Sequence, residues 1–227
     1  RKSSEGLQGF QAVSGWLHNV IVSKHADAME AFPEPSILPR EAGDRQEAGM
    51  LSKIIPVILE QNEFEKTYSD AMWQKLKTGT GVYKVWWDAE KLNGLGDIAI
   101  ERVDLLNVFW EPGVADIQDS RYFFHTRLED NEELEESYPQ LKGRLKSSGF
   151  LANRFVYDDA VSTEGKSTVI DVYYKRRQDG RTVLHYCKYV GETVLYATEN
   201  EAALARMEGR EAEGRGLYDH GLYPFVF

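Results

Sequence analysis

The stretch LLNVFWEPGVADIQDSRYFFHTR, from Leu105 to Arg127, decides how the rest of the chain is interpreted. It holds two apolar runs separated by a polar break, with these charged or ionisable side chains: Glu111, Asp116, Asp119, Arg121 and His125. Metal-dependent hydrolases bring two or three carboxylates onto one cation, so this composition fits an active site. The same residues are also typical of the turn that joins two antiparallel strands.

The turn interpretation is favoured by the local sequence. Pro112-Gly113 is a turn dipeptide, and Asp116 and Asp119 can each bond nearby backbone in Asx turns, with Arg121 paired to one of them. Asp97 and Glu101 are the carboxylates most able to complete a metal site, but Val103 follows where a lysine would be wanted. We therefore expect no catalytic residue here.

The other candidate ligands do not have metal-site spacing. His18 and His25 are seven residues apart, whereas a helical metal pair needs positions i and i+4. His125 and His185 lie in apolar, strand-like surroundings typical of core histidines, and Cys187 between aromatics is expected to be a small buried hydrophobe. The sequence predicts neither a metal nor a cofactor.

Two aromatic pairs, Trp86-Trp87 and Tyr173-Tyr174, have the composition of a stacking platform for single-stranded nucleic acid. Adjacent strand residues point to opposite faces of a sheet, so one member of each pair is expected in the core. The formal net charge is −10, from 27 basic and 37 acidic side chains. This charge opposes a phosphate-binding surface and argues against tight DNA binding as the main task.

Composition limits the class of protein further. The 227 residues include a single cysteine, so no disulfide can form within the chain. No apolar run approaches the roughly 20 residues that span a bilayer. The chain does not begin with methionine and stops inside the apolar run Leu222–Phe227, so we expect it to be a fragment of a longer protein.

Hydrophobic periodicity predicts an α+β fold: two N-terminal helices followed by a mainly antiparallel β-sheet with a short acidic helix inserted. The first helix is expected within residues 6–32. The second is long, from Asp44 to about Lys77, with Glu47 completing a capping box and Pro56 kinking it.

The period then changes to that of strands. A hairpin is expected over residues 82–103, and the acidic helix over 130–138, with Asp130 and Glu133 spaced as a capping box. A polar span at 142–167 is expected to be loop-like. Three further strands are predicted at 169–177, 182–190 and 193–197.

The order of these elements resembles the portal proteins, the head-to-tail connectors of tailed bacteriophages and related prophages. Three motifs carry the resemblance: LKTGTGVYKVWWD at 76–88, the stretch at 105–127 and NEELEESYP at 131–139. Glu111 stands where many relatives carry Asp, and Ser120 where many carry Ala. The match covers roughly Asp44 to Tyr138, and more loosely residues 173–175 and 216–227.

The resemblance implies a structural virion protein that is not an enzyme, a subunit of the portal ring at one capsid vertex through which DNA is packaged and ejected and to which the tail attaches. Residues 1–42 would form an N-terminal helix and Pro-rich linker, and residues 43–227 a wing-like α+β domain.

Implied partners are further copies of the subunit, the major capsid and scaffold proteins, the packaging terminase, and tail or adaptor proteins. DNA would pass without tight binding, and no membrane would be involved. Assembly would occur in the host bacterial cytoplasm. A metal-dependent hydrolase or nuclease using carboxylates of residues 105–127, and another phage structural or interaction module, are the alternatives.

Overall fold

The computed structural model describes residues 15–145, 155–156, 159–160, 164–207 and 216–227. The chain divides into two compact units, one formed by Arg1–Arg102 with Phe227 and the other by Val103–Val226.

The first unit contains the helices α1 (Trp16–Glu30), α2 (Arg45–Gln61) and α3 (Phe64–Thr78). A 3-10 turn, η1 (Ala42–Asp44), precedes α2. His18 and His25 of α1 meet Trp73 of α3 edge-on, with ring centroids 6.0 and 5.5 Å apart. His25 Nε2 also lies 3.0 Å from the Ser69 carbonyl oxygen. The two histidines therefore attach α1 to α3.

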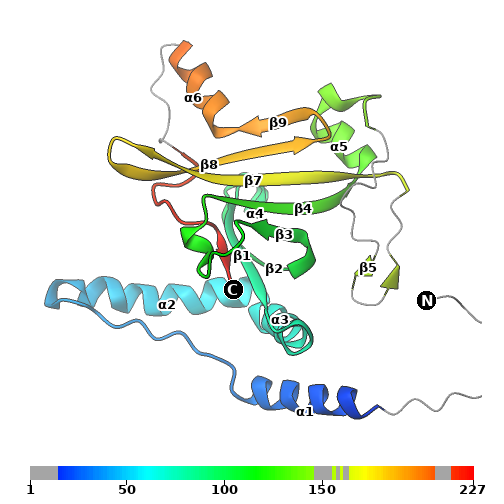
Figure 1. The fold of residues 1–227 in the computed structure, drawn as a ribbon. Helices are drawn as coiled ribbons and strands as arrows, with labels where there is room; N and C mark the ends of the chain where they lie inside the picture. The colour runs from blue at the N-terminus through cyan, green and yellow to red at the C-terminus, as the bar shows by residue number, and fades with distance from the viewer. Residues whose placement is uncertain (1–14, 146–154, 157–158, 161–163, 208–215) are drawn as a thin grey trace, which may run out of the picture. The chain divides into compact units, whose positions relative to one another are not determined.

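The prediction of one helix from Asp44 to Lys77, kinked at Pro56, is wrong. The chain leaves the helix at Gln61 and starts a new one at Phe64, while Pro56 remains inside α2. Glu63, between the two helices, has a left-handed backbone with φ 47°. In Figure 1, α2 runs across the view and α3 is seen nearly end-on, so the break redirects the chain.

Asn62 explains where the helix breaks. Its side-chain Nδ2 donates to the Ile58 carbonyl (2.8 Å) in the last turn of α2 and to the Ile98 carbonyl (3.1 Å) in the hairpin. Its Oδ1 accepts from Lys91 Nζ (2.7 Å) and from the Ile100 backbone N–H (3.2 Å). Asparagine competes well for backbone groups, and here its bonds outside the helix favour the break.

The capping box predicted between Asp44 and Glu47 is not formed, because Asp44 faces the other way along the chain. Its Oδ2 accepts the Glu41 backbone N–H at 3.1 Å, which closes the 3-10 turn before α2.

The predicted hairpin is present as the neighbouring strands β1 (Val82–Asp88) and β2 (Asp97–Val103). The short turn α4 (Lys91–Gly94) lies between them in the chain. Gly96 has φ +78° and lies directly under the Trp87 indole, where an added Cβ would come within 2.5 Å of Cζ2. Only glycine fits this close approach.

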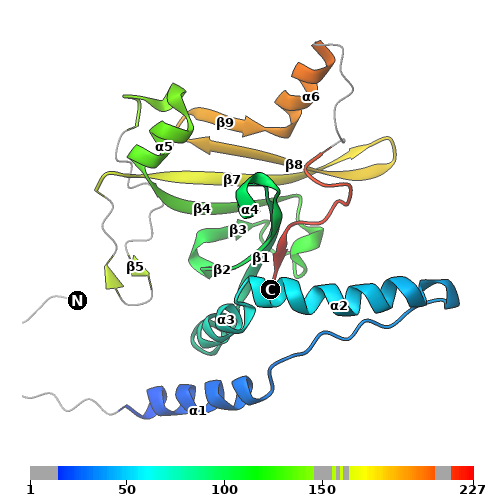
Figure 2. The same cartoon turned by 180° about the vertical axis from the view of Figure 1, so that it is seen from behind.

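The second unit is built on a five-stranded antiparallel sheet (Figure 2). Its strands, in spatial order, are β3 (Val108–Trp110), β4 (Tyr122–Asp130), β7 (Lys166–Gln178), β8 (Arg181–Val190) and β9 (Thr193–Ala197). Every neighbouring pair is antiparallel. The acidic helix α5 (Asn131–Ser137) follows β4. The predicted α+β class is therefore confirmed.

Shorter elements complete this unit. They are the turns η2 (Leu105–Asn107), η3 (Ile117–Asp119) and η4 (Pro139–Leu141), the two-stranded pair β5 (Phe155–Val156) and β6 (Asp159–Ala160), the helix α6 (Thr198–Met207) and the strand β10 (Phe225–Val226). Most of the span 142–167, predicted to be loop-like, lies outside the described residues; its described part differs from the prediction in containing β5, β6 and the first two residues of β7.

One end of the sheet is covered by α5 and η4. Leu134 and Leu141 pack against Val169 of β7 and Val190 of β8, and all four are buried. The capping box predicted between Asp130 and Glu133 is not formed, since the side chain of Asp130 makes no cap hydrogen bond. Instead the Asn131 backbone N–H donates to the Gly165 carbonyl (2.9 Å), and this bond fixes the start of the helix.

We predict that Asn62→Ala lowers the free energy of unfolding by about 1–2 kcal/mol, because it leaves several partly buried backbone and ammonium groups without their partner. Urea denaturation of the purified chain measures this. Gln61→Ala, one residue earlier and exposed, is the matched control and should lie within about 0.5 kcal/mol of wild type. Equal effects of the two substitutions would contradict the role given to Asn62.

Candidate functional site

The stretch from Leu105 to Arg127 forms the strand–turn–strand unit that its sequence predicts. β3 and β4 pair with Val108 opposite His125 and Trp110 opposite Phe123. The turn between the strands contains η3, and Ile117 within it is buried. Glu111, Asp116, Asp119 and Arg121 therefore lie in the connection between two adjacent strands, whereas His125 lies within β4.

Arg121 pairs with Glu111, and not with Asp116 or Asp119 as the sequence suggested. Its Nη2 and Nε lie 2.5 and 3.0 Å from Glu111 Oε1. These hydrogen bonds and the guanidinium charge lower the pKa of the Glu111 carboxyl. The β3–β4 register explains this pairing. Trp110 lies opposite Phe123, so Glu111 comes level with Tyr122 and within reach of its neighbour Arg121. A surface ion pair of this kind contributes little to stability.

Asp116 behaves as the turn interpretation predicts, with Oδ1 accepting the Gln118 backbone N–H at 2.8 Å. For Asp119 the outcome differs: its backbone N–H donates to the Asp116 carbonyl (2.9 Å). Both carboxylates also act on Lys175, whose pKa is lowered by burial and partly restored by the charges of Asp119 and Asp116. These acids thus stabilise an ammonium group of the protein itself.

Gln118, inside the turn, holds the C-terminal segment in place. Its Oε1 accepts the Tyr223 backbone N–H (2.8 Å), and its Nε2 donates to the Tyr223 carbonyl (3.2 Å). The Tyr223 hydroxyl donates to the Ser120 carbonyl (2.8 Å). Lys175 Nζ donates to the Gln118 carbonyl and lies 4.3 Å from the Tyr223 ring centroid. The turn therefore has a structural task.

His125 takes part in a buried polar network on one face of the sheet. The β4–β7 register places it opposite Asp171, and its Nδ1 lies 3.6 Å from Asp171 Oδ2. Asp171 is fully buried, at 0% exposure. Arg127 Nη2 lies 3.1 Å from the same oxygen, and the Tyr186 hydroxyl donates to Asp171 Oδ1 (2.6 Å). Burial, reinforced by the charge of Asp171, raises the pKa of Tyr186.

Asp171 is not among the candidate residues that the sequence indicates, although its pattern holds a signal. In the strand 169–174 the alternate residues Val169, Asp171 and Tyr173 share one face, and the first and last are apolar residues of the core. A carboxylate between two buried positions has to be paired, because an isolated buried charge is prohibitively unstable. We call Asp171, His125, Arg127 and Tyr186 the Asp171 network.

His185 occupies the opposite face and is also buried. Gln178 Nε2 lies 3.1 Å from its Nε2, so that ring nitrogen accepts, and Nδ1–H donates to Thr198 Oγ1 at 3.1 Å. The pKa of His185 is lowered by burial, with Glu199 opposing and Arg176 reinforcing the shift. This histidine is a structural residue of the core, as its surroundings predict.

The remaining candidates are also accounted for by packing. Cys187, which the sequence predicted to be buried, is partly exposed, so that prediction is wrong; the burial it does have raises the pKa of its thiol. Tyr173 is buried, whereas Tyr174 stacks on His185 from the other face. Trp87 is 56% exposed, and Lys84 Nζ lies 4.7 Å from the Trp86 ring centroid. The two members of each aromatic pair therefore lie in different surroundings, one more buried than the other.

Within the described residues no group of three or more His, Cys, Asp or Glu side chains is arranged to hold a metal ion. The same part of the chain contains no helix of the length and hydropathy required to cross a membrane.

The fold and its interactions define a structural module, an antiparallel sheet whose polar residues stabilise turns and a buried network. Comparison with protein families gives a match to the phage P22-like portal protein family over residues 27–216. The match covers most of the chain, and the chain therefore belongs to this family. A comparison with curated proteins finds no match. The family confirms the portal resemblance and makes the chain a structural virion component, a head-to-tail connector protein of bacteriophage type.

We predict that Asp171→Asn lowers the free energy of unfolding by about 3 kcal/mol, because removing one partner of a buried charge network leaves the others poorly compensated. Chemical denaturation measures the change. Glu129→Gln is the control: Glu129 Oε1 lies 3.3 Å from Arg127 Nη2, but the pair is partly exposed and should contribute less than about 1 kcal/mol. A loss for Asp171→Asn as small as the control would show that the network contributes little.

The lowered pKa of His185 predicts a pH dependence of stability. The unfolded chain binds the proton near the ordinary pKa of about 6.5, and the folded chain only at lower pH. His185 therefore contributes stability that is full above about pH 6.5 and is lost as the pH falls toward the folded-state pKa. The unfolding free energy of wild type should fall more steeply than that of His185→Gln between pH 7 and 5.

The matched control for this titration is His220→Gln, at an exposed position. Because His185 is still present in this variant, its curve should be steeper than that of His185→Gln, as the wild-type curve is. Parallel curves for His185→Gln and wild type would refute the assignment.

Proposed function

We propose that this chain is part of a subunit of a closed ring at one vertex of the capsid, through which DNA is packaged and ejected and to which the tail attaches. The observation that carries the proposal is the family match over residues 27–216. The architecture supports it, since the polar residues of the 105–127 stretch are used in turns and in a structural network.

A ring requires a heterologous interface, in which each subunit presents two different surfaces to its neighbours. The proposed partners are further copies of the subunit, the major capsid and scaffold proteins, the packaging terminase, and tail or adaptor proteins. Assembly would take place in the host bacterial cytoplasm. Within the subunit we propose residues 1–42 as a helix with a Pro-rich linker and residues 43–227 as a wing-like domain.

The proposal includes a passive role toward DNA. A net charge of −10 leaves few cationic groups to neutralise phosphates, and a translocating duplex moves best along a surface that does not hold it. We propose that no residue of the chain is catalytic and that none holds a metal or cofactor. In support, Glu111 is engaged by Arg121, and Asp116 by its own turn.

Electron microscopy tests the ring directly. The complete gene product that contains this chain, produced in a bacterial host, should form rings with an axial channel when viewed by negative stain. A stable two-fold dimer built on a large apolar surface would contradict the proposal, because isologous pairing uses the surface that ring closure requires.

We predict weak duplex binding and no cleavage. At ~150 mM salt the chain should bind a fluorescent DNA duplex no more tightly than the non-specific range of about 10⁻⁴–10⁻⁶ M, measured by anisotropy. Incubation of plasmid with the chain and Mg²⁺ or Mn²⁺ should leave it intact, and Asp119→Ala should change nothing. Sub-micromolar binding, or cleavage abolished by Asp119→Ala, would instead support the nuclease alternative.

A further inference from the structure

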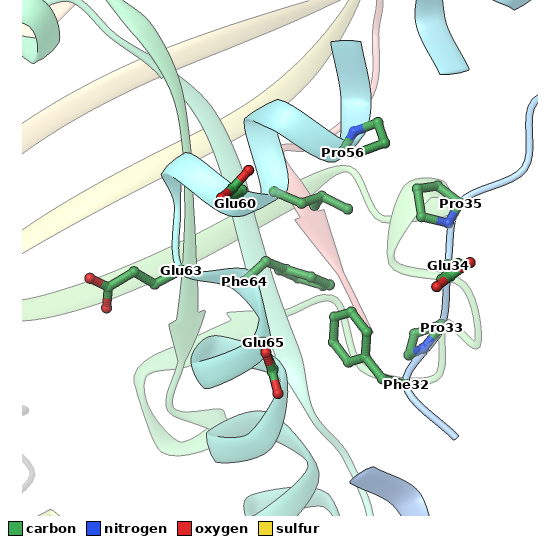
Figure 3. Close-up of a pocket in the computed structure, with 10 residues that line it drawn as sticks. Phe32, Pro33, Glu34, Pro35, Pro56, Glu60, Glu63, Phe64 and Glu65 are labelled. Carbon is green, nitrogen blue, oxygen red and sulfur yellow. The ribbon is translucent and has the colours of Figure 1, made fainter. Parts of the chain in front are cut away.

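The first unit contains a cavity between the linker that follows α1 and the junction of α2 with α3. Its volume is about 540 Å³, within the range of roughly 300–1,000 Å³ that is typical of ligand pockets. Its apolar lining comes from three segments of the chain: Phe32, Pro33 and Pro35 of the linker, Pro56 and Leu59 of α2, and Phe64 of α3. Figure 3 shows the Phe32 and Phe64 rings between α2 and the linker prolines.

The walls of this cavity are shaped by aromatic contacts and by prolines. The Phe64 ring centroid lies 6.1 Å from that of Phe32 and 5.9 Å from that of Tyr83, and Phe32 meets Tyr68 edge-on at 5.2 Å. Prolines fix the backbone dihedral φ at three positions of the lining. A preformed pocket of this kind loses little conformational entropy when a side chain enters it.

The charge around the cavity has one sign. Four glutamates complete its lining, namely Glu34, Glu60, Glu63 and Glu65, and all four are exposed to solvent. Among the described residues that line it there is no Lys or Arg. The side chain of Glu63 points away from the cavity in Figure 3, so the other three are the closer charges. An apolar floor with an acidic rim repels anionic ligands and attracts a cation with an apolar part.

We propose that this cavity, which we call the Phe32–Phe64 groove, docks a short basic peptide segment of another protein. One aromatic or long aliphatic side chain of the segment enters between Phe32, Leu59 and Phe64. Lysines or arginines on either side of that anchor pair with Glu34, Glu60 and Glu65. The arrangement follows the usual anatomy of a docking site, in which a buried apolar anchor supplies affinity and rim charges supply selectivity and rate.

The charge pattern selects this occupant over others. A free apolar molecule would gain nothing from the nearby carboxylates, and nucleic acid would be repelled by them. The docking does not depend on ring formation, since every residue involved lies in the first unit of a single chain.

The test uses the purified chain and a short fluorescein-labelled peptide that carries one tryptophan among lysines, with anisotropy as the readout. A control peptide has glycine in place of the tryptophan. We expect saturable binding of the first peptide, weaker binding of the second, and loss of affinity as salt shortens the screening length. Equal binding of the two peptides would overturn the proposal, because the cavity would then contribute nothing.

Two variants of the chain locate the site. Glu34→Gln/Glu60→Gln should weaken binding of the tryptophan peptide by about tenfold. Leu59→Ala should weaken the tryptophan peptide but leave the glycine control peptide unchanged. The charge-matched control is Glu47→Gln/Glu90→Gln, which alters exposed acids outside the groove and should bind like wild type. Circular dichroism and the urea midpoint verify that each variant is folded.

Three further outcomes would overturn the proposal: no saturable binding, equal affinities for the groove variant and its charge-matched control, or concentration-dependent dimers that Leu59→Ala abolishes. The last result, measured by light scattering, would show that a second copy of the chain occupies the groove.

Discussion

The pairing register of β4 with β7 is the constraint on which the second unit depends. Nine residue pairs run from Tyr122 opposite Tyr174 to Asp130 opposite Lys166. This register places His125 opposite Asp171 and Phe123 opposite Tyr173. An ionisable side chain therefore faces an ionisable partner, and an aromatic ring faces another aromatic ring. A slip by one residue would turn every side chain of β4 to the other face. Such a slip would expose the apolar side chains of the core. It would also separate the buried Asp171 carboxylate from the partners on β4 that compensate its charge.

A charged network inside a sheet adds specificity more than stability, because the desolvation of each ion offsets much of its attraction to the others. The partners of Asp171 come from both flanking strands: Arg127 and His125 from β4, and Tyr186 from β8. Only one alignment of the three strands brings these groups together. In a subunit that presents the same surface in every copy of an assembly, a single strand alignment matters more than a small gain in the free energy of unfolding.

The sequence predicts the elements of this fold well where periodicity is strong and local. The strands at 82–88, 182–190 and 193–197 match closely, and the inserted acidic helix lies where it is expected. The largest error, the missed helix break, arises because the deciding partner is distant in the chain. The break at Asn62 depends on the carbonyl of Ile98, and no property of residues 44–77 reveals it.

The same limit applies to the candidate site. The sequence identifies the turn at 105–127 and the core histidines. It does not reveal that Arg121 pairs with Glu111, because this ion pair depends on the β3–β4 register. It also leaves the Phe32–Phe64 groove unseen. That cavity exists only because a linker from one end of α1 returns beside the junction of two later helices.

The chain between β4 and β7 leaves and re-enters the sheet at one point, since the backbone N–H of Asn131 donates to the carbonyl of Gly165 at 2.9 Å. The two ends of the segment between β4 and β7 are thus already held together by the sheet. The entropy of closing a loop grows only with the logarithm of its length, so lengthening the segment beyond Leu141 costs the fold little. This position is therefore where the module can accept inserted sequence, an epitope or even a small domain, without disturbing the alignment of its strands.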